Sequence, residues 1–319
     1  MDIIFPALED LAALKILKKI ADKVAAPIVF DWSSYEVTRS KKNSRNFFVR
    51  YGLPRALSWP QAEFPVIVKP VEGSGSRGIY KVDSSSRLKE VKAKFSQENN
   101  DIIIEEYLSG PAYSIEVIAG KEKLYTFLPT KLKFDDDYDC RQVLAGEIIP
   151  EDTADELKKL AERCAGYLNL TGIMDLEVIA SRQGLKIMEI DARFPSQTPI
   201  TVYEASGKNM VNILAKIFRQ KFGEKIEGLS TAGLYESQSV DSVIYEQIRV
   251  DKGQIKTVGE HIISQARDLR LKTDFFGADK AITDYSPGSS SWRAILIFRG
   301  ECMAAVREKR RKTFNFIER

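Results

Sequence analysis

Acidic residues stand at alternate positions in an apolar segment near the middle of the chain. Glu189 lies in the apolar run 185–190, Asp191 directly follows that run, and Glu177 lies in the apolar segment before it. Side chains alternate between the faces of a strand, so Glu189, Asp191 and the following Arg193 share one face. Buried carboxylates are costly unless they are compensated, and Mg²⁺ ions bridging them to phosphate oxygens would do so. This pattern favours a metal site at the three carboxylates, with Arg193 beside the phosphoryl group, over a solvated hairpin face.

A glycine-rich loop precedes these carboxylates in the chain. Residues 73–78 match the pattern G-x-G-x-x-G, but a strand-like segment follows them, whereas a dinucleotide fingerprint leads into a helix. The Gly-Lys-Ser/Thr of a P-loop and the His-Arg-Asp of a protein kinase are both missing from the sequence. The remaining reading is a β-hairpin loop that folds over a triphosphate. Backbone N–H groups such as that of Gly75 and the hydroxyl groups of Ser74 and Ser76 would donate to phosphate, next to the ammonium of Lys69. The alternative is a plain surface turn.

Composition narrows the remaining function classes. The single histidine, His261, excludes a multi-histidine metal site, and its neighbours suggest a structural role in a strand. Lys and Arg are spread along the chain at a net charge of +3, and the one basic run, 307–312, reads as a solvated helix face, so no nucleic-acid partner is expected. No apolar run is long enough for a membrane span, and residues 1–7 do not resemble a signal peptide. Three widely spaced cysteines predict neither a zinc site nor a disulfide framework and fit a reducing cytoplasm.

The elements that must position these residues follow from periodicity. Apolar residues at helical spacing predict a helix over 10–24, between short strands at 3–5 and 28–30. The segment 31–60 is helical and basic, with a break at 52–54. Further along we expect helices near 84–97, 152–168 and 207–220, a strand at 102–104, paired strands at 172–180 and 185–190, and a final helix. The chain is therefore an α/β protein with α+β elements.

With a phosphate-covering hairpin and a carboxylate strand in this order, the chain resembles the ATP-grasp superfamily over about residues 60–200. The segments that carry the resemblance are FPVIVKP at 64–70, IIIEEYL at 102–108 and MEIDAR at 188–193. The resemblance implies an ATP-grasp fold and a nucleotide held by Lys69 and by hinge residues Glu105, Glu106, Tyr107 and Leu108. It also implies three regions: residues 1–31 as a remnant of an N-terminal β-α-β lobe, 32–220 as the ATP-grasp domain with its hinge near 105–108, and 221–319 as a mixed C-terminal subdomain.

A closer resemblance runs nearly from end to end. The stretch 189–199 (EIDARFPSQTP), together with 135–140 and 172–177, is similar to the ligases of pyrrolysine biosynthesis, which join 3-methylornithine to the ε-amine of lysine. This likeness implies that the ornithine-like substrate contacts Asp139, Asp175, Arg193, Ser196, Gln197 and Thr198, that the lysine lies near Glu9, and that Glu246 is a further acidic candidate. Acidic side chains are what substrates with ammonium groups require.

Two features depart from the resemblance. Many ATP-grasp enzymes have Gly-Glu after the hinge, with the Glu on the ribose, whereas this chain has Gly110-Pro111. The chain also enters directly on its first strand. A sheet that began there would expose an unpaired edge, so the resemblance implies about sixty further residues ahead of Met1.

The resemblance thus implies an ATP- and Mg²⁺-dependent carboxylate–amine ligase that works through an acyl phosphate, with Lys69 and Arg193 as its catalytic cations. The predicted substrates are 3-methylornithine and L-lysine, and a homodimer is compatible with the family. Two alternatives remain open: an ATP-grasp ligase for another amino-acid pair, and a non-catalytic module that binds nucleotide or amino acid.

Overall fold

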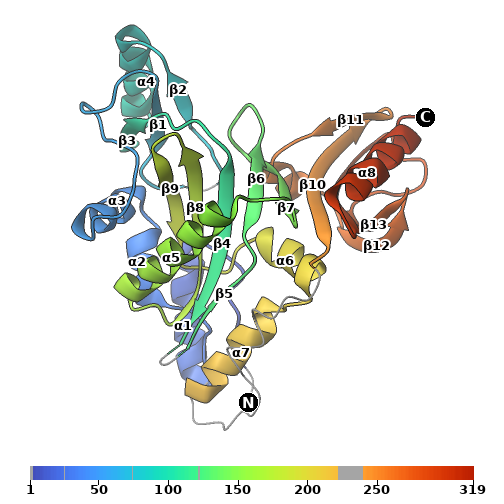
Figure 1. Ribbon diagram of the computed structural model, residues 1–319, viewed down its shortest axis with the longest axis horizontal. Coiled ribbons are helices and arrows are strands. Elements are labelled where there is room, and N and C mark those ends of the chain that lie inside the picture. The colour runs from blue at the N-terminus through green and yellow to red at the C-terminus, as the bar shows by residue number, and fades with distance from the viewer. Residues whose placement is uncertain (1–2, 25, 74, 121–122, 222–239) are drawn as a thin grey trace.

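The structure, a computed structural model, describes residues 3–24, 26–73, 75–120, 123–221 and 240–319. Two sheets form its framework, a small one and a large one (Figure 1). Among the described residues, no helix is long and apolar enough to cross a membrane.

The small sheet contains the predicted hairpin. Its order is β2-β1-β3, with β1 at Val66–Pro70, β2 at Tyr80–Val82 and β3 at Ile102–Glu106, and both pairings are antiparallel. The helix α4 (Ser85–Gln97) covers it through Leu88, Val91 and Phe95, which lie on one helical face and are buried. The strand–loop–strand prediction around the glycine-rich segment is confirmed.

The large sheet joins the middle of the chain to its C-terminal part. Eleven strands of the described chain belong to it, and its main path runs β12-β13-β14-β10-β7-β6-β4-β8-β9, with β11 paired to β10 and β5 to β4. The strands are β4 (Ala112–Ala119), β5 (Leu124–Thr126), β6 (Thr130–Phe134), β7 (Cys140–Ala145), β8 (Gly172–Ser181), β9 (Gly184–Asp191), β10 (Ser242–Asp251), β11 (Gln254–Thr257), β12 (Arg270–Phe275), β13 (Ala278–Thr283) and β14 (Ser291–Gly300).

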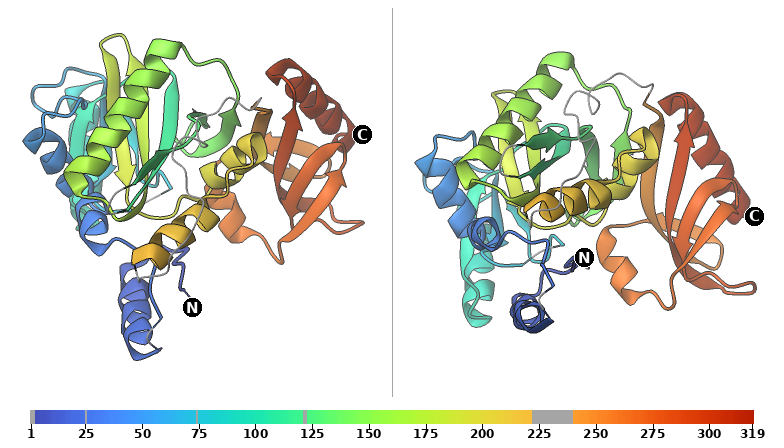
Figure 2. Two further views of the ribbon diagram at one scale, coloured as in Figure 1. Left: turned by 60° about the horizontal axis from the view of Figure 1, so that its bottom comes forward. Right: turned by 90° about the horizontal axis from the view of Figure 1, so that it is seen from below.

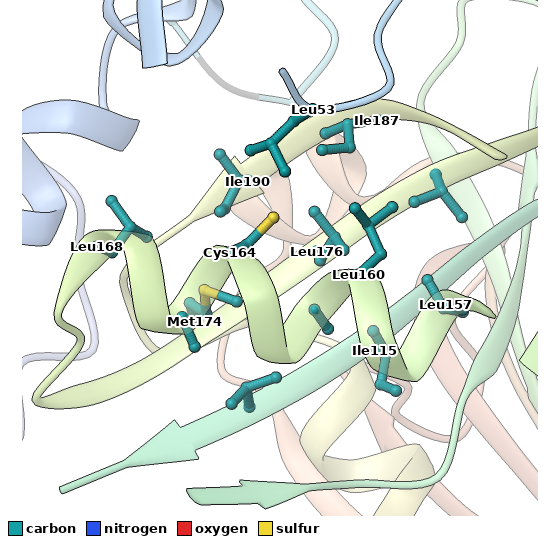
Figure 3. Packing of buried hydrophobic residues seen from close by; sticks show 14 of the residues in the cluster. Leu53, Ile115, Leu157, Leu160, Cys164, Leu168, Met174, Leu176, Ile187 and Ile190 are labelled. Atoms are coloured by element: carbon teal, nitrogen blue, oxygen red, sulfur yellow. The ribbon is translucent and has the colours of Figure 1, made fainter. Parts of the chain in front are cut away.

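One helix fixes which face of β8 and β9 is buried. Leu157, Leu160 and Cys164 lie on one side of α5 (Glu151–Leu168) and pack on Met174 and Leu176 of β8 (Figure 3). Each fully buried Leu contributes about 1.5–3 kcal/mol. Because strand side chains alternate, the residues between these apolar positions are directed to the opposite face of the sheet. Packing against α5 therefore turns the acidic residues of both strands to that other face.

The N-terminal part is only partly as predicted. The helix α1 (Leu11–Val24) forms where expected and projects from the body of the molecule (Figure 2). The expected strands at 3–5 and 28–30 are reduced to one parallel bridge between Ile4 and Ile28. A strand needs a run of consecutive ladder pairings with its neighbour, and this segment has one. Two short helices follow, α2 (Trp32–Thr38) and α3 (Lys41–Arg50).

Two predictions for the later part need correction, whereas the predicted final helix is confirmed. A helix, α6 (Thr198–Ser206), precedes α7 (Met210–Lys221), so the predicted helix over 207–220 starts at residue 210 and an extra helix lies before it. His261 lies in a 3₁₀ turn, Glu260–Gln265, and not in a strand. The last helix, α8 (Met303–Ile317), packs on β10 and β14.

Candidate active site

Two rows of polar side chains cross the face of the large sheet that lies opposite α5. The antiparallel register of β8 with β9 places Glu177 opposite Glu189 and Asp175 opposite Asp191. On its other side, β8 pairs with β4, where Glu116 lies opposite Asp175. The carboxylates that the sequence predicted to act together are thus brought side by side by strand register.

These carboxylates lie in an environment that resists their ionisation. Burial raises the pKa of Glu177 to about 8, and the charges of Glu189 and Asp191 add to the rise. Burial also raises the pKa of Asp191 to about 6, although Arg193 opposes the shift. The pKa of Asp175 is raised well above its usual range by burial and then by Asp191. The site therefore has an unmet need for positive charge.

A magnesium ion fits this donor set only with help from a ligand. Within the described ranges, no three His, Cys, Asp or Glu side chains come together closely enough to hold a metal ion. Mg²⁺ is commonly bound by one or two carboxylates, with substrate phosphates and water completing its octahedron. The pair Glu177 and Glu189, with Asp191 beside them, fits that role.

A hinge cavity of about 340 Å³ lies where the small sheet meets the large one. All four predicted hinge residues line it, as do Lys69, Ser76, Glu177 and Glu189. These hinge residues are Glu105, Glu106, Tyr107 and Leu108. The chain passes from β3 to β4 here, through Gly110, where a Cβ atom would meet the carbonyl oxygen of Ala180 at 2.0 Å.

Lys69 is held at the wall of this cavity by a buried ion pair. Its Nζ lies 2.6 Å from Glu105 Oε1, and the other oxygen of Glu105 contacts Arg45. Burial lowers the pKa of Lys69 to about 8, and Glu189 opposes that shift. The sequence predicted only a nucleotide contact for Glu105. In the structure its side chain holds Lys69 in position.

The glycine-rich loop is tied to the opposite wall. Ser76, at a positive φ of 53°, donates its hydroxyl hydrogen to the carbonyl oxygen of Tyr138 over 2.6 Å. Gly75 has a φ of 62°, a left-handed conformation that glycine adopts without strain. Both residues line the central cavity described next. Ser74, the other predicted hydroxyl donor, lies outside the described residues.

A central cavity of about 120 Å³ opens above the carboxylate rows. Six acidic residues line it against three basic ones, which makes it a site for cationic groups. The acidic residues are Asp139, Asp175, Glu177, Glu189, Asp191 and Glu260, and the basic ones are Lys41, Arg77 and Arg193. Ser196, Gln197 and Thr198, which the resemblance assigned to the substrate, are also in its lining.

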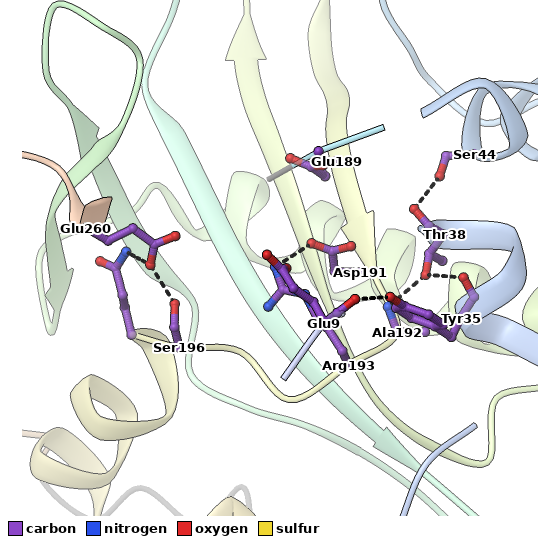
Figure 4. Close-up of polar contacts among 12 residues, drawn as sticks. Glu9, Tyr35, Thr38, Ser44, Glu189, Asp191, Ala192, Arg193, Ser196 and Glu260 are labelled. Carbon is purple, nitrogen blue, oxygen red and sulfur yellow. Dashed lines mark hydrogen bonds and ion pairs between the residues drawn. The ribbon is translucent and has the colours of Figure 1, made fainter. Parts of the chain in front are cut away.

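An outer cavity of about 380 Å³ adjoins the central one beside α1. Glu9 and Asp10 line it from the N-terminal segment, and Asp191 and Arg193 are shared with the central cavity. Arg193 Nη2 lies 3.1 Å from Glu9 Oε2 and 3.2 Å from Asp191 Oδ2 (Figure 4). The arginine therefore stands at the boundary between the two cavities.

Glu189 lines the hinge, central and outer cavities alike. Its partner is Lys41, whose Nζ lies 3.3 Å from Glu189 Oε1 and also donates to the carbonyl oxygen of Gly73 over 2.7 Å. Sequence reasoning missed Lys41. The sequence feature that could have identified it is its place in the first turn of a helix that ends at the Gly-x-Pro of residues 52–54.

Glu260 was missed as well. Its Oε2 accepts hydrogen bonds from Ser196 Oγ at 2.8 Å and Gln197 Nε2 at 2.9 Å, and it thereby joins the C-terminal part of the chain to the central cavity (Figure 4). Nothing in the local sequence marks it, because it is a lone acid more than sixty residues from its partners.

Asp139 is less accessible to a substrate than the sequence predicted. It is 3% exposed, its Oδ2 contacts His261 Nδ1, and it accepts the backbone N–H of His261 over 3.1 Å. Gly259 makes this approach feasible, since a Cβ atom there would lie 2.1 Å from the Asp139 carboxylate. Asp139 thus anchors the turn that presents Glu260.

Glu246 is not brought to this site. Both oxygens of its carboxylate contact Arg310 of α8, and the residue lines a separate cavity on the other face of the sheet. Its neighbour in sequence, Tyr245, pairs with Val143, which does line the central cavity. Alternation along β10 directs consecutive side chains to opposite faces, which sequence reasoning could not assign without the pairing.

Glu116 allows a prediction of pH-dependent stability. It is fully buried, and burial raises its pKa from 4.5 to about 7, although the Ser114 and Thr198 hydroxyl groups oppose the rise. Between pH 4.5 and pH 7 the unfolded chain loses this proton before the folded one, so stability falls as pH rises. A pKa shift of one unit is worth about 1.4 kcal/mol. The free energy of unfolding of Glu116→Gln, relative to that of wild type, should therefore be higher at pH 8 than at pH 5 by up to about 3 kcal/mol.

The measurement is urea unfolding of wild type and variant at both pH values. Glu90→Gln on the exposed side of α4 is the matched control. Its free energy of unfolding should differ from that of wild type by the same small amount at both pH values. An equal effect of Glu116→Gln at pH 5 and pH 8 would contradict the buried, proton-holding carboxyl.

Comparison with known proteins places the chain in a family. Residues 37–197 match the model of the ATP-grasp domain. The 3-methyl-D-ornithine–L-lysine ligase of Methanosarcina mazei is 33% identical over 272 residues, which cover 84% of this chain and 67% of that protein. The D-alanine–D-alanine ligase of Lacticaseibacillus casei is 24% identical, over 54% of this chain and 51% of that protein.

Solved structures agree on the fold. Biotin carboxylase from Campylobacter jejuni superposes with a TM-score of 0.76 at 14% identity, covering 99% of this chain and 78% of that one. The L-amino acid ligase from Bacillus licheniformis gives 0.65 at 16% identity, over 93% and 75% of the two chains. The chain therefore belongs to the ATP-grasp family and is an ATP-dependent ligase that forms carbon–nitrogen bonds.

Proposed function

We propose that the chain joins 3-methyl-D-ornithine to the ε-amine of L-lysine, with MgATP bound in the hinge cavity. The observation that supports this proposal most directly is that Glu189 lines all three cavities. A ligase of this kind must hold a nucleotide, a carboxylate substrate and an amine substrate within reach of one another. The 33% identity to the Methanosarcina mazei enzyme supports this pair of amino acids.

The nucleotide is assigned to the hinge cavity. Residues 105–108 would meet the adenine, and Lys69 and Lys41 would lie along the phosphates. Mg²⁺ held at Glu177 and Glu189, with Asp191 nearby, would neutralise charge on the phosphates. Lys69 is well suited to bind them because Glu105 and Arg45 fix its position.

The ornithine-like substrate is assigned to the central cavity. Its two ammonium groups match the excess of carboxylates there, which includes Asp175 and Glu260. Its carboxylate would lie toward Arg193, so that one of its oxygens takes the γ-phosphoryl group of ATP and ADP leaves. Arg193 would bind the resulting acyl phosphate and stabilise its charge.

Lysine is assigned to the outer cavity, where Glu9 and Asp10 suit an ammonium group. Its ε-nitrogen must lose a proton before it attacks the acyl carbon and expels phosphate. Asp191 lines both the central and the outer cavity, so its carboxylate is placed to accept that proton. The free thiols of Cys140, Cys164 and Cys302 fit a reaction in a reducing cytoplasm.

The test is release of ADP and phosphate with each amino acid omitted in turn. We expect turnover to need both lysine and 3-methyl-D-ornithine, or D-ornithine as its analogue, and mass spectrometry should detect the amide product. Turnover with D-alanine alone would reassign the chain to another amino-acid pair. ATP binding without turnover on any pair would instead support a non-catalytic module.

A further inference from the structure

A second polar cavity, which we call the α8 pocket, lies on the far side of the sheet from the central cavity. Its volume is about 220 Å³. The strands β6 and β7 separate the two cavities: Leu132 and Val143 line the central one, and Lys133 and Gln142 line the α8 pocket. Its charged lining residues are Lys133, Arg141, Glu246, Arg307 and Arg310.

Four cations and one carboxylate line the α8 pocket, and the carboxylate is already satisfied. Glu246 contacts Arg310 Nε through one oxygen and accepts from Arg310 Nη2 at 2.7 Å and Thr257 Oγ1 at 3.2 Å through the other. Arg307 is paired with Glu147 at 2.7 Å. No lining carboxylate is left over for another cation.

Lys133 and Arg141 are the two cations without such a partner. Over the described residues, neither side chain forms an ion pair or a hydrogen bond. Both are partly buried, so solvent screens their charges less than at an open surface. Burial lowers the pKa of Lys133, Glu147 opposes the shift, and Arg307 and Lys131 add to it. The pocket is therefore a concave region of uncompensated positive charge.

The rest of the basic run on α8 does not continue this charge across the surface. Lys309 is paired with Asp279 at 2.7 Å, and Arg311 with Glu308 at 2.7 Å. A nucleic-acid site would need an extended stripe of available cations. The described cations of this run are thus paired, and Lys133 and Arg141 lie within one cavity, which favours a small ligand.

We propose that the α8 pocket binds a phosphate-type oxyanion between Lys133 and Arg141, with Arg307 at its rim. Guanidinium forks and ammonium groups are the side chains that bind phosphate oxygens most strongly. A water molecule occupies about 30 Å³, so the pocket admits a tetrahedral oxyanion with water or a small organic group attached to it. Gln142 adds an amide donor within the same lining.

A ligand here would contact the same two strands that line the central cavity with their other face. Its binding would hold Lys133 and Gln142 in place and, with them, the adjacent Leu132 and Val143. Since linkage is reciprocal, ligands of the two cavities should then alter each other's affinity.

The experiment is calorimetric titration of the full chain with inorganic phosphate, against chloride at equal ionic strength. We expect saturable binding that weakens at least tenfold in the double variant Lys133→Gln/Arg141→Gln and is largely retained in Arg141→Lys. The matched control is Lys69→Ala, which alters the hinge cavity and should leave phosphate binding to the α8 pocket unchanged. Circular dichroism checks that each variant is folded.

Two further arms identify the ligand. Tighter binding of O-phosphoserine than of inorganic phosphate would point to an organic phosphate, and equal binding to free phosphate. Phosphate binding that is lost in Lys69→Ala and kept in the double variant would overturn the proposal, since the anion would then lie in the hinge cavity. Binding of a single-stranded oligonucleotide, abolished by the double variant while phosphate has no effect, would overturn it in favour of nucleic acid.

Discussion

Glu189→Gln should reduce kcat by about 10³-fold or more, equivalent to about 4 kcal/mol of transition-state stabilisation. The change keeps the shape of the side chain and removes its charge at the one described position that lines the hinge, central and outer cavities. The side chain is 36% exposed, so the fold should persist. The measurement is the rate of ADP release at saturating ATP, Mg²⁺ and both amino acids.

Asp191→Asn should show a similar loss, since Asp191 belongs to the same carboxylate rows. Glu90→Gln, which removes an exposed carboxylate from α4, is the control and should stay within about threefold of wild type, as for most surface substitutions. Near-normal rates for both site variants at saturating Mg²⁺ would mean that the carboxylates serve only as surface charges.

Arg193→Ala should lower kcat by about 10²–10³-fold, because a preorganised cation at a developing charge is worth about 3–4 kcal/mol. The guanidinium lies between Asp191 and Glu9, at the boundary of the central and outer cavities. Arg193→Lys should recover only part of the rate, since an ammonium keeps the charge but not the planar fork.

The measurement is kcat and KM for each amino acid, with Arg182→Ala at the exposed turn of the same hairpin as the control. If Arg193→Ala raises KM for lysine alone and leaves kcat intact, the residue binds the amine and has no role at the acyl phosphate. A fold-wide loss of structure is tested separately by circular dichroism.

The carboxylate hairpin was predictable because its determinants are local. Apolar residues at every second position, such as Leu176 and Ile190, define the face that α5 buries, and the acidic residues between them must then share the other face. The glycine-rich hairpin was predictable for the same reason. Its two strand-forming segments and the glycine-rich loop between them lie within twenty residues of sequence. Strand register alone then aligned Glu177 with Glu189.

The sequence by itself therefore determined the two hairpins, the helices that cover them and the acidic and basic groups that these hairpins carry. Only the tertiary structure decided which distant residues complete that site. Lys41 reaches Glu189 across 148 residues of chain, and Glu260 reaches Ser196 across 64. Glu246, one residue from a position on the central face, is turned to Arg310 instead. Such contacts depend on how strands separated in sequence pair and which face each helix covers, and short-range periodicity carries no information about either.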